Sequence, residues 1–216
     1  MMTSNIEIFF IIALISLVII AIFASITLVL SLKKENRACC IGAGILLAIT
    51  SIALGILVFT GGLLFIVSIL SFDFFEILVI VSSFFLFIIA LFASLFTLLA
   101  VKKNVKFCCL GGGIALAGIG IGVGLILSVS IFLFLFGVPL FIFIVLSIIT
   151  LALISIVAFI VILVSLKKCE GLCCLAGSIS LVGVVIGWSL FGFFTVLVLF
   201  VFAPPVDIFG SMDIFG

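Results

Sequence analysis

Histidine and tyrosine are absent from this sequence, tryptophan occurs once, and only 7% of the 216 residues are charged. Without histidine the chain cannot form the Ser-His or Cys-His pairs that activate nucleophiles, and haem and copper sites lose their usual ligand. Eight basic residues against seven acidic ones offer no basic face to a nucleic acid. We therefore expect a protein that is not an enzyme, holds no cofactor or metal ion, and binds no nucleic acid.

Apolar residues are abundant instead, at 69% of the chain, whereas ordinary soluble domains have about 45–50%. The charges, together with Gly137-Val138-Pro139 between the fourth run and the fifth, divide the chain into six apolar runs. Each is longer than the ~20 residues that a membrane-crossing helix needs. These runs are Ile8–Leu32, Ile41–Phe72, Ile77–Val101, Leu110–Phe136, Leu140–Leu166 and Leu175–Ala203. The sequence predicts an all-α integral membrane protein with six transmembrane helices, folded as a single transmembrane domain over residues 1–216.

Glycine and proline mark the expected breaks. The second run is too long for one straight helix, and Thr60-Gly61-Gly62 is expected to bend it or end it. Gly137-Val138-Pro139 is expected to separate the fourth and fifth spans. Two prolines end the last helix, which leaves 204–216 as a tail outside the membrane. Trp188, near the middle of the sixth span, is expected to face the bundle interior because its N–H needs a partner in hydrocarbon.

The few charges are sorted by side. Three loops, each about eight residues long, hold every basic residue and carry a net charge of +6, while the opposite side carries −5. Short loops rich in lysine and arginine stay in the cytoplasm. We therefore expect these loops to be cytoplasmic and both termini to be extracytoplasmic. The residues that set this topology are Lys33, Lys34, Arg37, Lys102, Lys103, Lys106, Lys167 and Lys168.

The same three loops reveal an internal repeat. Each reads Lys-Lys, four further residues and Cys-Cys, starting at Lys33, Lys102 and Lys167. The starting points lie 69 and 65 residues apart, so the repeated unit is a helical hairpin present three times. The hairpins are expected over 6–72, 76–137 and 139–203. Two spans per unit make the repeats parallel, arranged about a pseudo-threefold axis or in a less symmetric six-helix bundle.

Small residues recur four apart in the second helix of each hairpin. Ser51 precedes Gly55 by four residues, and glycine pairs of the same spacing follow in the fourth and sixth spans. Such faces let helix backbones approach closely in a membrane, where lipid removes any hydrophobic force between helices. A glycine-lined conduction path is the alternative. The residues expected to pack helices together are Gly118, Gly120, Gly122, Gly124, Gly183 and Gly187.

Cysteine pairs form the one chemically suggestive set. They begin the second helix of each hairpin, and Cys169 is an additional thiol. A reducing cytoplasm argues against structural disulfides. Juxtamembrane cysteines are common S-acylation sites, soft-metal binding is a second use, and service as small apolar residues is a third. The candidate acylation or thiol sites are Cys39, Cys40, Cys108, Cys109, Cys173 and Cys174.

The function expected from these features is structural. The spans carry packing motifs and no Asp, Glu, Lys, Arg, His, Asn or Gln within the membrane, and such groups are what pumps and ion-coupled transporters require. We expect an accessory or lipid-organising subunit of a membrane assembly, in contact with membrane lipids and with other membrane subunits or further copies of itself. A passive channel for small neutral or apolar solutes along the repeat axis is the alternative.

Overall fold

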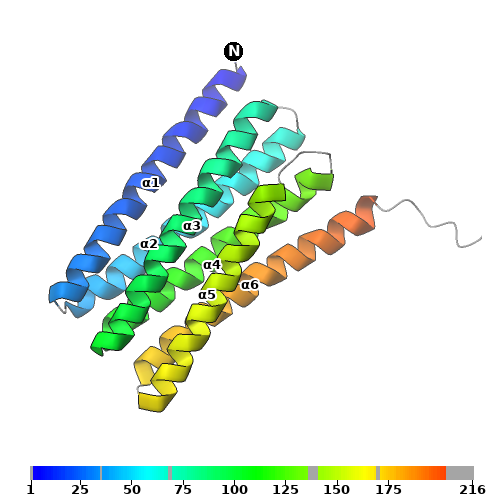
Figure 1. Ribbon diagram of the computed structural model, residues 1–216. Coiled ribbons are helices and arrows are strands. Elements are labelled where there is room, and N and C mark those ends of the chain that lie inside the picture. The colour runs from blue at the N-terminus through cyan, green and yellow to red at the C-terminus, as the bar shows by residue number, and fades with distance from the viewer. Residues whose placement is uncertain (1, 35, 68–69, 136–140, 169–170, 203–216) are drawn as a thin grey trace, which may run out of the picture.

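The computed structural model describes residues 2–34, 36–67, 70–135, 141–168 and 171–202 (Figure 1). The described residues confirm an all-helical chain with six long apolar helices. These are α1 (Met2–Lys34), α2 (Arg37–Ile66), α3 (Phe72–Lys103), α4 (Lys106–Leu135), α5 (Phe141–Lys168) and α6 (Gly171–Phe202). The apolar spans within them contain 24 to 32 residues. At about 1.5 Å per residue, each is long enough to cross a hydrocarbon core of about 30 Å.

The lysine-rich connections are tight because polar residues end and start the helices there. Asn36 precedes α2 and accepts a hydrogen bond from the Cys39 backbone N–H at 3.5 Å. Asn104 follows α3 in the left-handed conformation, with φ 64°, which asparagine tolerates better than most residues. These two polar connections therefore turn the chain back within a few residues and hold α1 beside α2 and α3 beside α4.

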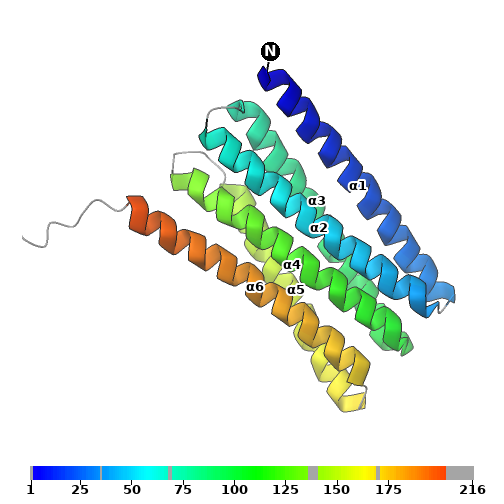
Figure 2. The same ribbon diagram turned by 180° about the vertical axis from the view of Figure 1, so that it is seen from behind.

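The helices form two layers. Helices α1, α3 and α5 lie in one layer and α2, α4 and α6 in the other, as the front and back views show (Figures 1 and 2). Helix α4 is central: 72% of its most apolar stretch is buried, against 11% for α1 and 22% for α6. Closure about a threefold axis would bring α6 against α2. In the described residues α6 packs mainly against α4 and α5, and it meets α2 through the Phe59 and Phe194 rings, whose centroids are 5.3 Å apart. The three hairpins therefore form an open row.

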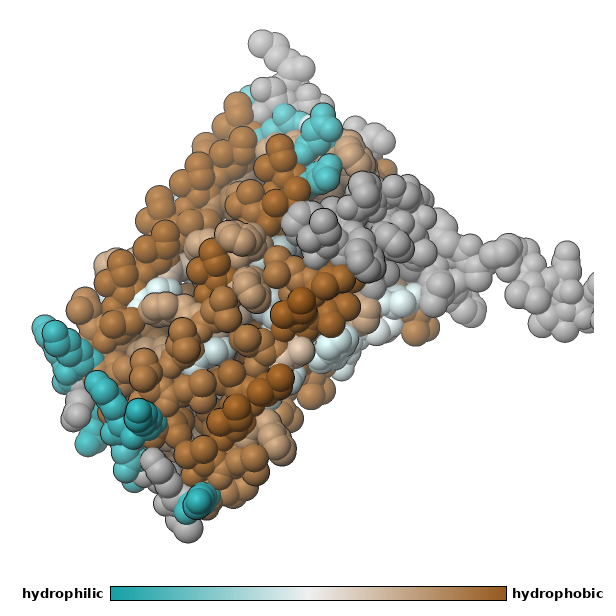
Figure 3. All heavy atoms as spheres, in the orientation of Figure 1, coloured by the Kyte–Doolittle hydropathy of each residue, from teal (hydrophilic) through white to brown (hydrophobic). Residues whose placement is uncertain are grey.

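Polar residues gather at the two ends of the helices and leave an apolar band between them (Figure 3). One end holds the lysines that close α1, α3 and α5. The other end holds acidic residues, among them Glu7, whose carboxylate accepts a hydrogen bond from the Ser71 hydroxyl at 3.0 Å. This bond ties the start of α1 to the connection between α2 and α3. The band is what a helix bundle surrounded by hydrocarbon requires.

One local expectation is wrong in part and another is wrong. Helix α2 runs through Thr60-Gly61-Gly62 and ends only at Ile66, so the two glycines do not end the span. Gly61 and Gly62 are buried, and an added Cβ there would meet side chains of α3 and α4, so close packing accounts for them. Trp188 does not face the interior: its side chain is 38% exposed and lies edge-on to the Phe191 ring. Helix α6 ends the row and packs on one side only. The expected turn at Gly137-Val138-Pro139 and the tail at 204–216 lie outside the described residues.

Candidate functional site

The junction between α2 and α4 is a direct contact of two backbones. A Cβ added to Gly55 would lie 2.7 Å from the Gly122 carbonyl oxygen and 2.8 Å from its Cα. In the same way, Cβ atoms added to Gly118 and Gly122 would overlap the backbones of Ala48 and Ser51. Ordinary van der Waals contact begins near 3.4 Å. Side chains larger than hydrogen therefore cannot enter this junction without moving the helices apart.

The junction between α4 and α6 has the same character. A Cβ on Gly124 would lie 2.5 Å from the Gly187 Cα, and one on Gly120 would lie 3.1 Å from the Gly183 carbonyl carbon. Gly183 in turn faces the backbone of Ala117. All six glycines that the sequence marks for helix packing thus lie in these two junctions. Backbone approach of this kind supplies dispersion contacts that lipid tails cannot replace.

The two glycine pairs of α4 point in opposite directions. Gly118 and Gly122 meet α2, whereas Gly120 and Gly124 meet α6. A displacement of two residues turns a helix by about 200°, which places the pairs on opposite sides. Sequence reasoning identified both pairs but did not use the two-residue offset, which indicates two partners for one helix. It also missed Gly44, Gly111 and Gly113, which lie in the same junctions nearer the cysteine end.

The buried hydroxyl groups of the described residues are all serine or threonine. Most of them donate a hydrogen bond to a backbone carbonyl of their own helix. The Ser51 hydroxyl donates to the Leu47 carbonyl at 2.8 Å, that of Thr97 to Ala93 at 2.7 Å, and others do the same four residues back. A hydroxyl bonded to its own helix offers a solute little beyond one acceptor site. The bonded hydroxyls therefore add little polar lining to the spaces between helices, whereas the buried hydroxyls of Ser82, Ser83, Ser94 and Ser180 have no hydrogen-bond partner.

The cysteine pairs do not behave alike. Cys40 and Cys108 form a disulfide between α2 and α4, with their Cα atoms 4.8 Å apart. The sequence argument against structural disulfides is wrong here, because it considered only the expected compartment. The close backbone approach of α2 and α4 brings two facing cysteines within the Cα separation that a disulfide spans. Two of the six candidate cysteines are therefore disulfide-bonded and carry no free thiol.

The other cysteines differ in access. Cys39 is exposed on the first turn of α2, and Cys174 is half-buried on α6. Cys109 and Cys173 are buried. Within the described part of the chain, no group of three or more His, Cys, Asp or Glu side chains lies close enough to hold a metal ion. Cys169 is outside the described residues. Among the cysteines that the structure describes, Cys39 is accordingly the one that a modifying reagent or enzyme reaches most readily.

The basic residues lie together at the cysteine end, where the odd-numbered helices end and the even-numbered ones begin. The described side chains among them are exposed. The Arg37 guanidinium lies over the Phe107 ring, 4.9 Å from its centroid, and so links the first turns of α2 and α4. A cation over an aromatic face at this distance is a favourable contact. The positive charges thus form a polar edge beside the disulfide.

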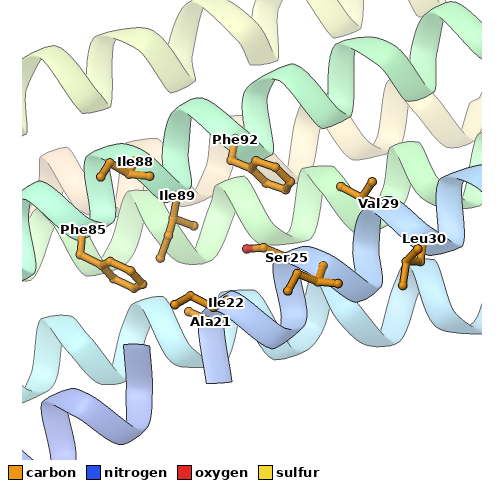
Figure 4. Close-up of a pocket in the computed structure, with 10 residues that line it drawn as sticks. Ala21, Ile22, Ser25, Val29, Leu30, Phe85, Ile88, Ile89 and Phe92 are labelled. Carbon is orange, nitrogen blue, oxygen red and sulfur yellow. The ribbon is translucent and has the colours of Figure 1, made fainter. Parts of the chain in front are cut away.

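A separate groove of about 360 Å³ lies between α1 and α3 (Figure 4). Ser25 is the one lining residue with a polar side chain, and several lining residues on α1 are exposed to the surroundings. Its volume is that of a small ligand pocket. Such a groove fits an apolar chain better than a polar solute. The lining residues are Ala21, Ile22, Ser25, Ile26, Val29, Leu30, Phe85, Ile88, Ile89 and Phe92.

Comparison with known proteins supplies no function for this chain. No protein-family model matches it, and neither does any curated protein or solved structure. The function must therefore be argued from the geometry. The described residues offer close-packed helix junctions, a disulfide between two hairpins, an apolar groove and broad apolar outer faces.

Proposed function

We propose that this chain is a multi-pass membrane protein that serves as a structural, non-enzymatic subunit of a membrane assembly. The observation that carries the proposal is the packing of α4, whose backbone touches α2 on one side and α6 on the other. Close-packed hairpins joined in this way form a rigid, flat array, because tightly packed interiors have low compressibility. Its broad outer faces are apolar and suit contact with lipid or with neighbouring subunits.

The hairpins are proposed to be parallel repeats that all cross the membrane in the same sense. The repeated Lys-Lys and Cys-Cys motifs support this, because all three lie at the same end of the helices. Parallel repeats suit a subunit that presents one polar edge on one side of the membrane. The groove between α1 and α3 supports a lipid-organising role, since its lining suits an acyl chain.

We place the basic loops in the cytoplasm and both termini on the opposite side, following the distribution of lysine and arginine. The Cys40–Cys108 disulfide lies at the same end, and disulfides persist mainly in oxidising compartments. The charges carry more weight, because all eight basic residues lie in these loops.

A membrane-impermeant maleimide tests the orientation. Cys39, which is exposed, is expected to react only after the cells are permeabilised. The Cys39→Ser variant is the control for labelling at other thiols. Labelling of Cys39 in intact cells would place the loops outside and overturn this orientation.

The structural role is tested by purifying the full chain from its native membrane into lipid nanodiscs after mild crosslinking. A complex much larger than the 22.9 kDa chain is expected. A monomer under every mild condition would contradict the proposal. Liposomes that carry only this protein supply a second measurement: flux of small neutral solutes would favour a channel instead, whereas an unchanged permeability agrees with a structural subunit.

A further inference from the structure

The two glycine junctions use corresponding positions of the sequence repeat. Positions in α2, α4 and α6 correspond after shifts of 69 and then 65 residues. The contact of Gly44 with Gly111 becomes the contact of Gly113 with Ala176 under these shifts, and both contacts are present. The chain therefore builds the second junction as a copy of the first.

The other backbone contacts recur in the same way. Ala48 meets Gly118 at the first junction, and Ala117 meets Gly183 at the second. The contact between Gly55 and Gly122 likewise corresponds to that between Gly124 and Gly187. We call the side of an even-numbered helix that meets the next hairpin its forward face, and the side that meets the preceding hairpin its backward face. A forward face thus always packs on a backward face.

The open row leaves one face of each kind without a neighbour in the described residues. The backward face of α2 comprises Cys39, Gly42, Ile49 and Ala53, which correspond to Cys108, Gly111, Gly118 and Gly122. A Cβ on Gly42 would meet nothing within 4 Å, although its counterpart Gly111 contacts the α2 backbone. Gly42 and Ile49 are exposed. This face keeps a cysteine, a glycine and an alanine at contact positions.

The forward face of α6 comprises Cys174, Ser178, Val182, Val185 and Ser189. The last four are exposed, and their counterparts in α4 form the junction with α6. Trp188 lies close to this face and is 38% exposed, whereas its counterparts Leu54 and Val123 are only 0% and 3% exposed. Helix α6 therefore presents to the surroundings a surface that the two earlier hairpins bury.

We infer that copies of this chain associate head to tail, with the forward face of α6 in one copy packed on the backward face of α2 in the next. The inference rests on the proposed structural function and names its partner as a second copy. The internal junctions are the templates, so Cys174 lies beside Cys39 of the next copy, as Cys40 lies beside Cys108. An interface between two different faces extends into a closed ring or an open row.

The junction between copies is wider than those within the chain. Val182 would face Ile49 of the next copy, at the position where Ala48 faces Gly118 internally. Larger side chains keep the backbones further apart and weaken association in a membrane. The contact between copies is consequently the reversible one, while the internal junctions are permanent.

Oxidative crosslinking of the full chain in native membranes tests the pairing. Copper–phenanthroline and oxygen accept two electrons and two protons from two thiols, and one S–S bond forms. With Cys169→Ser as the background, wild-type positions 39 and 174 should give a ladder of dimers, trimers and larger species on a non-reducing gel. Either Cys39→Ser or Cys174→Ser alone should remove the ladder.

Mixing the two serine variants gives a sharper result. One copy then keeps only Cys174 on its forward face, and the other keeps only Cys39 on its backward face. Coexpression should therefore restore a dimer and nothing larger. A dimer from Cys174→Ser alone would indicate that Cys39 faces Cys39 and would overturn the head-to-tail arrangement. No ladder in the wild type, together with a large complex in the mild-crosslinking purification described above, would also overturn it while leaving the structural function intact. Monomers throughout would contradict both.

A cysteine-independent measurement uses Gly42. Gly42→Leu should block the backward face and raise the dissociation constant between copies about tenfold or more, as expected for overpacking. Gly42→Ala is the matched control and should leave association unchanged, because alanine occupies the corresponding position at Ala176. Quenching of Trp188 by brominated lipid should increase in Gly42→Leu, since α6 regains its lipid contacts. Equal quenching and equal dissociation constants in the two variants would contradict the inference.

Discussion

Replacement of Gly55 by alanine is the most direct test of the packing described above. Gly55 lies at the junction of α2 with α4, where a Cβ would come 2.7 Å from a carbonyl oxygen and 2.8 Å from a Cα of Gly122. Both atoms belong to the backbone and cannot rotate away. Contact at 3.4 Å would require the helices to separate locally by about 0.6–0.7 Å. A gap of that size forfeits a quarter to a half of the dispersion energy of each affected atom pair.

Gly42→Ala on the same helix supplies the reference, because a Cβ there meets nothing within 4 Å. Both substitutions gain about 1 kcal/mol of helix propensity relative to glycine. The difference between the two variants therefore isolates the packing cost. Overpacking of this kind costs about 1–3 kcal/mol. We expect Gly55→Ala to be less stable than Gly42→Ala by that amount.

The assay is equilibrium unfolding in mixed micelles at increasing mole fractions of a denaturing detergent, with the midpoint and slope compared between variants. A lower midpoint at an unchanged slope for Gly55→Ala is the expected result. Equal midpoints for the two variants would refute the reasoning, since the backbone contact with Gly122 would then be absent in the folded protein.

Three further outcomes are expected. Gly187→Ala should be about 1–3 kcal/mol less stable than Gly192→Ala in the same assay. The reason is that a Cβ at Gly187 overlaps the α4 backbone, whereas one at Gly192 meets open space. Equal stabilities would count against the junction between α4 and α6. Reducing the disulfide between α2 and α4 should lower the unfolding free energy by at most about 4 kcal/mol, because its two cysteines are 68 residues apart in the sequence. The loss is smaller if the bilayer confines the unfolded chain. An unchanged unfolding midpoint after reduction would contradict this prediction. Ser25→Trp should fill the groove and reduce photocrosslinking of α1 by an acyl-chain probe severalfold, while Ile156→Trp on exposed α5 should leave it unchanged; equal labelling would exclude lipid from the groove.

The helices themselves could be predicted from the sequence because two independent signals agree. Apolar runs give their lengths, and the lysines at 33–34, 102–103 and 167–168 mark where α1, α3 and α5 end. Glycine was a weaker guide. Gly61 and Gly62 indicated a break in α2, but an apolar helix continues through glycine when its neighbours pack against it, as α3 and α4 do here.

The arrangement of the hairpins was harder to predict, because a small-residue motif names a contact face without naming the partner. A ring of hairpins and an open row would both bury the face formed by Gly118 and Gly122, so this pair alone does not distinguish them. The decisive signal is that Gly120 and Gly124 interleave with the first pair, which gives α4 two opposite contact faces. The disulfide escaped prediction for a related reason: compartment says whether cysteines oxidise, whereas only the fold says which of them face one another.

The uneven burial of the helices follows from the same arrangement. In water, the exposed apolar surface of α1 and α6 would cost about 25 cal/mol for each Å² and would drive the row to close. Lipid removes that force, so a row can remain open and closure depends on packing alone. The end faces then retain whatever packing complementarity the repeat gives them. Because α2 keeps Gly42 at a position where Gly111 and Ala176 are already in contact with a neighbouring helix, the end of the row is built like its middle.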